Sequence, residues 1–291
     1  MFVIVHQRNT RRCVEECCGR QALRTEDFKL LADILVQRSG LALSENKIYL
    51  LESRLTPIAR KMGLETLDEL VAEVRRTKAE PLLKKITEAM TTNESFFYRD
   101  GKPFEIFRSF VLPNIMQART SKSLRIWSAA SSTGQEPYSL AMILKDEEIK
   151  LNDWQTEILG TDLSMEALKK AMAGIYSQFE VQRGLPIQQL MVYFKKVGVN
   201  WQIDPSIRAM VSYQQFNLLD SPASLGRFDV VFCRNVLNYF DQETKAQVLV
   251  RVANLLADDG YLFLGASETV MGVTDAFKPV IGQRGVYEKP K

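Results

Sequence analysis

Residues 124–140 read LRIWSAASSTGQEPYSL, and this stretch decides the fold. It begins as a short apolar, β-prone run, passes through small residues at 130–134 and opens a helix at Gln135. A strand, a loop of small residues and a helix are how α/β proteins present a nucleotide-like ligand at the carboxyl end of a strand. Small side chains let the backbone approach the ligand, Gly134 can take a positive φ at little cost, and Pro137 suits a first helical turn.

The same stretch also indicates the kind of ligand. It contains no lysine and neither of the complete glycine patterns that bind mono- or dinucleotide phosphates, and the carboxylate of Glu136 would repel a phosphate. A ligand with hydroxyl groups or a positive charge fits better than a polyphosphate, which points to S-adenosylmethionine. Taken alone, the stretch is equally compatible with a tight strand–helix turn that binds no ligand.

Strands and helices alternate through the rest of the chain after residue 120. Apolar runs predict strands at 157–162, 210–215, 228–233 and 261–265, and residues 277–280 and 285–288 predict a closing hairpin. This alternation predicts a doubly wound, mainly parallel α/β sheet with helices on both faces. The antiparallel hairpin is typical of the S-adenosylmethionine methyltransferases. A small β-insert, with a hairpin around Gly198, is expected at about 178–208.

Helical periodicity dominates the first third of the chain, so residues 25–91 are expected to form a small all-α domain. Thr25 is expected to cap its first helix and Gly40 to end it; Ser44 and Thr66 are expected to start the next two helices, and Pro57 to kink or split the second. A fourth helix is expected at about 81–91. Residues 1–24 are expected to be a poorly ordered leader, and residues 92–120 a linker and connecting helix.

Composition excludes several classes of protein. The net charge of +3 is too small to argue for nucleic-acid binding, and no apolar run is long enough to span a membrane. The apolar start at residues 1–5 is too short for the core of a signal peptide, so we expect a cytoplasmic protein. With one histidine, His6, histidine-based catalysis is effectively excluded.

The cysteines do not indicate a metal site. Cys13, Cys17 and Cys18 lie in the charged leader and Cys233 in a later apolar strand, which is not a zinc-ligand spacing. We expect free thiols and no bound metal.

Polar side chains follow several of the expected strands. Asp162, at the tip of the second strand, could accept both hydroxyls of a ribose. Asn217 and Leu218 could edge an adenine, and Asn235 and Val236 end the central strand. Each residue alone is a weak signal, but ligand-type residues after successive strands are harder to obtain by chance.

Four segments carry a resemblance to a known family: TTNESFFYRD at 91–100, SAASSTGQEPYS at 128–139, TDLS at 161–164 and FCRNVLNYF at 232–240. In this combination and order the chain, from about residue 25 to 288, resembles the chemotaxis receptor methyltransferases, the CheR family. The resemblance implies methyl transfer from S-adenosylmethionine to glutamate side chains of chemoreceptor cytoplasmic domains, with S-adenosylhomocysteine as the product. It implies cofactor contacts for Asn93, Ser95, Arg99, Ala130, Glu136, Asp162, Asn217, Leu218, Asn235 and Val236, and substrate handling by Arg99 and Tyr239.

The sequence departs from the motifs of this family at a few positions, and two alternative functions stay open. Gln135 stands where many members have a second acid, Ser95 replaces a threonine, and Tyr98 replaces a phenylalanine beside Arg99. The chain could methylate another substrate, although the NPPY-type loop of amino-methylating enzymes is absent, or it could be a non-catalytic cofactor-binding adaptor.

Two features bear on the chemoreceptor as partner. Lys47, Arg54 and Lys61 recur at intervals of seven beside the apolar stripe of the second helix, and could contact an acidic receptor bundle; the alternative is a solvated helix edge. The insert lacks the glycine-rich loop with which some members bind a receptor's C-terminal pentapeptide. We therefore expect no such tethering, unless Trp201 anchors a groove built from other residues.

Overall fold

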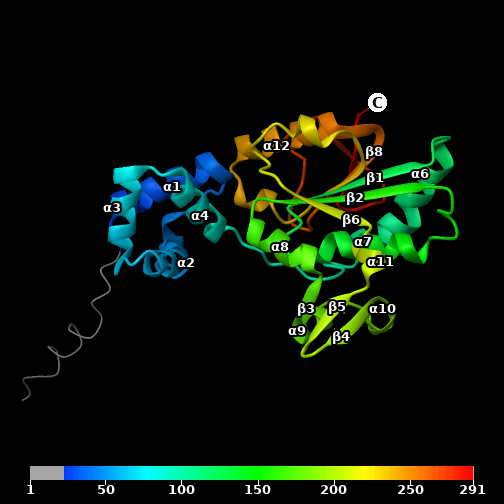
Figure 1. The fold of residues 1–291 in the computed structure, drawn as a ribbon. Helices are drawn as coiled ribbons and strands as arrows, with labels where there is room; N and C mark the ends of the chain where they lie inside the picture. Colours follow the sequence, from blue (N-terminus) through cyan, green and yellow to red (C-terminus); the bar gives the residue numbers. More distant parts are fainter. Residues whose placement is uncertain (1–22, 291) are drawn as a thin grey trace, which may run out of the picture.

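The computed structural model describes residues 23–290. The leader expected at residues 1–24, with Cys13, Cys17 and Cys18, lies almost entirely outside the described residues. Two parts follow along the chain: a bundle of helices at one end and a larger α/β part (Figure 1).

The helical part has four α-helices and its own apolar core. Its elements are α1 (Thr25–Ser39), the 3₁₀ turn η1 (Glu45–Lys47), α2 (Ile48–Lys61), α3 (Leu67–Thr77) and α4 (Glu80–Met90). Each helix buries an apolar stripe, represented by Leu31 and Leu35 of α1, Leu55 of α2, Val74 of α3 and Ile86 of α4. This burial stabilises helices that would be marginal alone.

Two of the predicted helix boundaries are confirmed and two are wrong. The Thr66 hydroxyl accepts the N–H of Glu69 as predicted, and Gly40 ends α1 in the left-handed conformation, with φ of 71°. Thr25 is already helical, so Arg24 holds the N-cap position without a side-chain bond. The Ser44 hydroxyl bonds a neighbouring side chain instead of the backbone, and the η1 turn precedes α2.

Pro57 does not divide the second helix. It lies inside α2, which runs unbroken from Ile48 to Lys61. Leu51, Leu55 and Ala59 are buried on either side of the proline, so tertiary packing holds the two halves together despite the missing N–H donor.

A connecting helical run leads into the α/β part. It consists of α5 (Lys102–Ile106), the π-helical stretch η2 (Phe107–Val111) and α6 (Leu112–Ala118). Phe107, Val111 and Ile115 from this run are buried against the sheet, so the connection is part of the core.

The main sheet confirms the predicted class. Its strands are β1 (Ser123–Ala129), β2 (Gln155–Asp162), β6 (Val211–Gln215), β7 (Phe228–Cys233), β8 (Leu256–Leu264), β9 (Lys278–Pro279) and β10 (Val286–Glu288), in the spatial order β6-β2-β1-β7-β8-β10-β9. Strands β6 to β8 in that order pair in parallel, and β10 pairs antiparallel with both neighbours. The closing hairpin is therefore present.

Both faces of the sheet are covered. Ile126 packs in the core cluster on one face, and the next residue, Trp127, packs in the cluster on the other. The covering helices are α7 (Gln135–Asp146), α8 (Met165–Ala173) and α12 (Gln242–Leu255), with short 3₁₀ turns η3 (Pro222–Leu225) and η4 (Leu237–Tyr239). In Figure 1, α12 lies on the opposite side of the sheet from α7 and α8. Such alternating burial is what a doubly wound sheet requires.

The β-insert is a separate antiparallel sheet of three strands in the order β3-β5-β4. It comprises β3 (Ile175–Ser177), α9 (Gln178–Gln182), α10 (Ile187–Tyr193), β4 (Phe194–Val197), β5 (Asn200–Ile203) and α11 (Pro205–Arg208). The hairpin predicted around Gly198 is the β4–β5 pair, and β3 pairs along the other side of β5. The insert projects beyond α7 and α8 (Figure 1).

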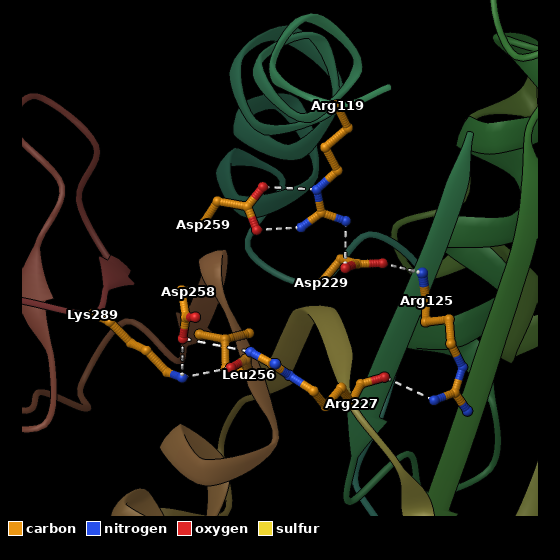
Figure 2. Close-up of polar contacts among 8 residues, drawn as sticks. All are labelled: Arg119, Arg125, Arg227, Asp229, Leu256, Asp258, Asp259 and Lys289. Carbon is orange, nitrogen blue, oxygen red and sulfur yellow. Dashed lines mark hydrogen bonds and ion pairs between the residues drawn. The ribbon is translucent and has the colours of Figure 1, made fainter. Parts of the chain in front are cut away.

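An ionic network ties the amino-terminal ends of the central strands (Figure 2). Arg119, at the end of α6, forms ion pairs with Asp229 of β7 and Asp259 of β8. The second oxygen of Asp229 accepts the N–H of Arg125 in β1 at 2.6 Å. The network therefore joins β1, β7 and β8 at the end opposite the loops that follow these strands. None of the described helices combines the length and apolar character needed to cross a bilayer.

Candidate functional site

The principal pocket lies at the carboxyl ends of β1, β2, β6 and β7, and the helical part contributes to its wall. Every residue predicted to contact the cofactor or to act in catalysis lines it: Asn93, Ser95, Arg99, Ala130, Glu136, Asp162, Asn217, Leu218, Asn235, Val236 and Tyr239. The structure thus brings together side chains that lie as far apart as residues 93 and 239 in the sequence.

The loop after β1 has an unusual backbone. Ala130, Ser132 and Gly134 all have positive φ, of 63°, 51° and 93°. A Cβ at Gly134 would lie 2.7 Å from the hydroxyl of Tyr213, so only glycine fits there. Non-glycine residues with positive φ cluster at ligand sites, where the surrounding structure holds them. The strain is consistent with a loop shaped to bring its backbone close to a ligand.

Asp162 is the last residue of β2, and its carboxylate joins the segments that follow β1 and β2. One carboxylate oxygen accepts the N–H of Ser132 and the other that of Ser164, both at 2.8 Å. Burial raises the pKa of this carboxyl, and the two backbone bonds oppose the rise. Each oxygen can still accept a further hydrogen bond, because a carboxylate oxygen has two lone pairs.

Glu136, at the start of α7, is held by two donors. The Ser128 hydroxyl donates to one oxygen at 2.8 Å, and the Arg234 guanidinium to the other at 2.9 Å. Burial raises the pKa of Glu136, and the charge of Arg234 is the largest opposing effect. A positively charged ligand beside Glu136 would add to that opposing effect.

Sequence reasoning did not assign a role to Arg234. Its side chain is fully buried and forms ion pairs with Glu136 and with Asp100, the latter at 2.7 Å. It also donates to the carbonyl of Arg99 at 2.9 Å. The only sequence signal was its place in the motif before Asn235. Its partners lie 98 to 135 positions earlier, which periodicity does not reveal.

Arg99 belongs to the segment between the two parts. Its guanidinium donates to the carbonyl of Glu94 at 2.9 Å and lies 5.3 Å from the ring centroid of Phe96. The side chain is only half-buried, and it lines the pocket. Among residues 23–290 the Arg99 guanidinium forms no ion pair: its sequence neighbours Glu94 and Asp100 pair with Arg183 and Arg234 instead.

Two hydrogen bonds fasten that segment over the pocket. The Ser132 hydroxyl donates to the carbonyl of Asn93 at 3.0 Å, and the Tyr98 N–H donates to the Ser139 hydroxyl at 3.0 Å. The segment thus reaches both the loop after β1 and helix α7.

A second residue that sequence reasoning missed is Glu268. This buried carboxylate accepts the N–H groups of Asn235 at 2.7 Å, Gly265 at 2.7 Å and Leu237 at 2.8 Å. It fixes the loop after β7, where Asn235 has a positive φ of 59°. No sequence pattern distinguished it from an ordinary loop glutamate.

Asn217 lines the pocket, but the protein itself uses its amide. The amide nitrogen donates to the carbonyl of Arg38 at 2.7 Å, and the amide oxygen accepts the N–H of Leu219 at 3.1 Å. The side chain thus joins the pocket wall to the helical part.

The residues of the basic row do not share one environment. Lys47 and Lys61 are exposed, whereas Arg54 donates to the carbonyls of Met90 and Thr91 at 2.7 and 2.9 Å. Arg54 therefore ties α2 to the start of the segment that carries Asn93. None of the three lies among the residues that line the pocket.

The charges of the pocket fit S-adenosylmethionine. Its lining includes Glu136 and Asp162, while Arg234 is neutralised by its own acidic partners. No lysine or histidine is among the described residues that line it. Acidic acceptors suit the ribose hydroxyls and the positive sulfonium. Of the described lining residues only Arg99 carries a positive charge without an ion pair, which is too little for a polyphosphate. Residues 23–290 also contain no cluster of side chains arranged to hold a metal ion.

The chain matches two models of one protein family. Residues 26–91 match the all-alpha domain of CheR methyltransferases, and residues 93–286 match their SAM-binding domain. It is 43% identical over 270 residues to Chemotaxis protein methyltransferase 1 of Pseudomonas aeruginosa, an alignment that covers 91% of this chain and 98% of the relative. It is 40% identical to Chemotaxis protein methyltransferase Cher2 of Pseudomonas putida, with the same coverage, and 37% identical to Chemotaxis protein methyltransferase of Vibrio anguillarum, which covers 91% and 97%.

Two family models thus account for nearly all of the described chain, and they match in the order in which its two parts occur. S-adenosylmethionine is accordingly the cofactor of this enzyme, and the chain belongs to the CheR methyltransferase family.

Proposed function

We propose that this enzyme methylates glutamate side-chain carboxylates on the cytoplasmic domains of chemoreceptors, for adaptation in chemotaxis-type signalling. The observation that carries the proposal is the convergence of Arg99 and Tyr239 on the pocket that contains Glu136 and Asp162. The relatives are named chemotaxis protein methyltransferases, which supplies the signalling context.

The chemistry needs little acid–base help. A glutamate with a pKa of about 4.3 is already ionised at neutral pH, so no general base is required. This agrees with a pocket whose described lining lacks histidine and lysine. S-adenosylmethionine supplies the methyl group: an oxygen–carbon bond forms as the sulfur–carbon bond breaks, and the two opposite charges cancel. The enzyme therefore gains most from alignment and from exclusion of water.

We assign Arg99 and Tyr239 to the orientation of the substrate. The half-buried guanidinium of Arg99 could hold a carboxylate through two parallel hydrogen bonds. The Tyr239 hydroxyl could donate one neutral hydrogen bond, which orients the nucleophile without strongly lowering its reactivity. Asp162 would accept the ribose hydroxyls, and Glu136 would lie near the positive charge of the cofactor.

The receptor would be met through its methylation helices. Exposed Lys47 and Lys61 on the helical part suit an acidic, glutamate-bearing bundle. The β4–β5 turn consists only of Gly198 and Val199, which is too short to shape a peptide groove. The indole N–H of Trp201 donates to Gln178 within the insert at 2.7 Å. We therefore propose that no C-terminal pentapeptide is tethered there; micromolar binding of such peptides at the insert would contradict this.

The test is incubation with methyl-labelled cofactor and purified receptor cytoplasmic fragments. A carboxyl methyl ester releases its label as volatile methanol in mild base, whereas a methylated amine does not. Base-labile label that depends on the receptor fragment supports the proposal. Base-stable label would indicate another class of substrate, and absence of transfer despite cofactor binding would favour an adaptor.

Variants of the two orienting residues make the test specific to the site. Tyr239→Phe removes only a hydroxyl, and should lower turnover by about five- to tenfold, the worth of one neutral hydrogen bond in the transition state. Arg99→Lys keeps the charge but loses the two-pronged geometry, so it should also lose turnover. Calorimetry with S-adenosylhomocysteine is the control, since the Tyr239→Phe variant should bind it as the wild type does. Full turnover by Tyr239→Phe would remove the hydroxyl from the proposed mechanism.

A further inference from the structure

A short strap from the helical part crosses the cofactor pocket. It consists of residues 38–42, which are the last two residues of α1 and the three that follow it. The carbonyl of Arg38 accepts the amide N–H of Asn217 at 2.7 Å, and the N–H of Ala42 donates to the carbonyl of Tyr239 at 2.9 Å. These anchors belong to the loops after β6 and after β7, so the strap joins two walls of the pocket. Between them, Ser39 and Leu41 line the pocket itself.

The middle residue of the strap, Gly40, makes this crossing possible. It has φ of 71° and is buried against Phe240, the neighbour of Tyr239. A Cβ at this position would lie 2.8 Å from Cδ1 of Phe240 and 3.2 Å from Cγ2 of Thr244. Because both neighbours belong to the α/β part, any side chain on Gly40 would push the strap away from the pocket.

We propose that Gly40 is a positioning residue, through which the strap 38–42 holds the Tyr239 loop in place and retains the bound cofactor. The strap couples the position of the helical part to the cofactor pocket. The statement about Tyr239 rests on its proposed catalytic role, whereas the statement about cofactor retention does not.

The strap can also open. Each of its two anchors is a single hydrogen bond between groups that water can satisfy when the strap lifts. Because Ser39 and Leu41 line the pocket, a cofactor bound there would pack against them and favour the closed position. A ligand that binds one of two positions better shifts the population toward it.

The chain offers a matched control glycine. Gly63 follows α2 in the same helical part and has φ of 78°, but nothing lies within 4 Å of a Cβ built on it. Gly40→Ala and Gly63→Ala therefore incur similar backbone strain, and only the first also meets Phe240.

The experiment compares these two variants in the full chain. We expect Gly40→Ala to weaken S-adenosylhomocysteine binding at least fivefold by calorimetry and to lower kcat on receptor fragments. Gly63→Ala should leave both values within twofold of wild type at a similar loss of Tm. Replacing Phe240 by leucine in the Gly40→Ala background removes the clashing ring atoms and should recover part of the lost affinity. Equal effects of the two alanines, or affinity unchanged by Gly40→Ala, would overturn the proposal.

A measurement on the wild type does not depend on any variant folding. S-adenosylhomocysteine should slow amide hydrogen exchange in residues 38–43 and leave exchange in residues 61–66 unchanged. Unchanged protection in 38–43 at saturating ligand would contradict a strap that closes over the cofactor. These binding readouts stay valid even if Tyr239→Phe retains full turnover, so the two proposals can fail separately.

Discussion

Asp162 has two tasks, and substitution can separate them. Its carboxylate accepts two backbone N–H groups and faces the pocket. Asp162→Asn keeps one acceptor oxygen, so it should lose about 1.5–3 kcal/mol of S-adenosylhomocysteine affinity, roughly 10- to 150-fold, with a modest loss of stability. Asp162→Ala leaves both N–H groups without an acceptor and should also lower Tm clearly. Calorimetric titration with each variant tests this, and wild-type affinity in Asp162→Asn would remove the residue from the cofactor site.

Cofactor affinity should fall on acidification. Burial raises the pKa of Glu136 and of Asp162 above the ordinary values of 4.5 and 3.8. A buried carboxyl with a raised pKa stabilises the fold most below its ordinary pKa, and this contribution is lost as pH rises through the raised value. The affinity for a positively charged cofactor has the opposite pH dependence: it increases as pH rises, because only the ionised carboxylate attracts a cation. Binding of S-adenosylmethionine should therefore weaken from pH 7 toward about pH 5.

Glu136→Gln provides the control for that pH dependence. It cannot change charge, so its affinity should be lower than that of the wild type at neutral pH and should vary less with pH. A Glu136→Gln curve parallel to that of the wild type would assign the effect to another group.

The site residues that could be predicted from the sequence are those whose role follows from their place next to a strand. Asp162 is the last residue of its strand, and Asn217 and Asn235 each lie two residues beyond theirs. Parallel strands bring their carboxyl ends together on one side of the sheet. Arg234 and Glu268 were missed because their roles depend on partners that only the fold brings near. A buried charge gives no sequence signal when its counter-charge lies a hundred residues away.

Among the elements, the basic row on α2 divides into two kinds of residue. Replacing both exposed lysines, Lys47 and Lys61, by glutamate should raise the KM for receptor fragments at low salt, because two attractive charges become repulsive. Tm and S-adenosylhomocysteine affinity should be unchanged. A KM equal to that of the wild type at low salt would mean that these lysines form only a solvated edge.

Arg54 should behave differently. It donates to two carbonyls at the end of α4, so Arg54→Glu should cost about 1.5–3 kcal/mol of stability in addition to any effect on KM. Thermal unfolding of this variant beside the double lysine variant separates the two contributions. A fully stable Arg54→Glu protein would show that these bonds are replaced by water without cost.

The elements themselves were largely predictable, and their boundaries less so. Apolar runs and turn residues located every strand of the main sheet, because a buried parallel strand must be almost continuously apolar. Pro57 does not split its helix, one of the two predicted outcomes, because tertiary burial of Leu51 and Leu55 outweighs a local helix breaker. Strand β8 begins at Leu256, five residues before the predicted start at 261, because Leu256 pairs with Phe228 of β7.

At the scale of the whole molecule, the ionic network of Arg119 and the cofactor pocket lie at opposite ends of the same parallel strands. Asp229 and Asn235 are six residues apart near the two ends of β7, which is about 20 Å in an extended strand. Arg119→Met leaves Asp229 and Asp259 without their cation, and should cost about 2–4 kcal/mol, because these pairs are only partly buried. Denaturant unfolding checks the loss, and S-adenosylhomocysteine affinity below the unfolding transition should stay within twofold of wild type. A large loss of affinity would show that the two ends are coupled.

The contact between the two parts was beyond sequence reasoning. The alternation of elements predicted a helical part and an α/β part, but nothing in the residues 38–42 indicated that they would reach Asn217 and Tyr239. Such contacts depend on how two separately patterned units meet. They are therefore visible only in the folded chain.

Locating the transferred methyl group tests the proposed reaction most directly. A receptor cytoplasmic fragment is methylated with this enzyme and S-adenosylmethionine, digested, and mapped by tandem mass spectrometry. We expect one added methyl group per modified residue, on glutamate side chains of the helical bundle, and none when those glutamates are replaced by alanine. Methyl groups on lysine, on a chain terminus or on a small molecule would contradict it.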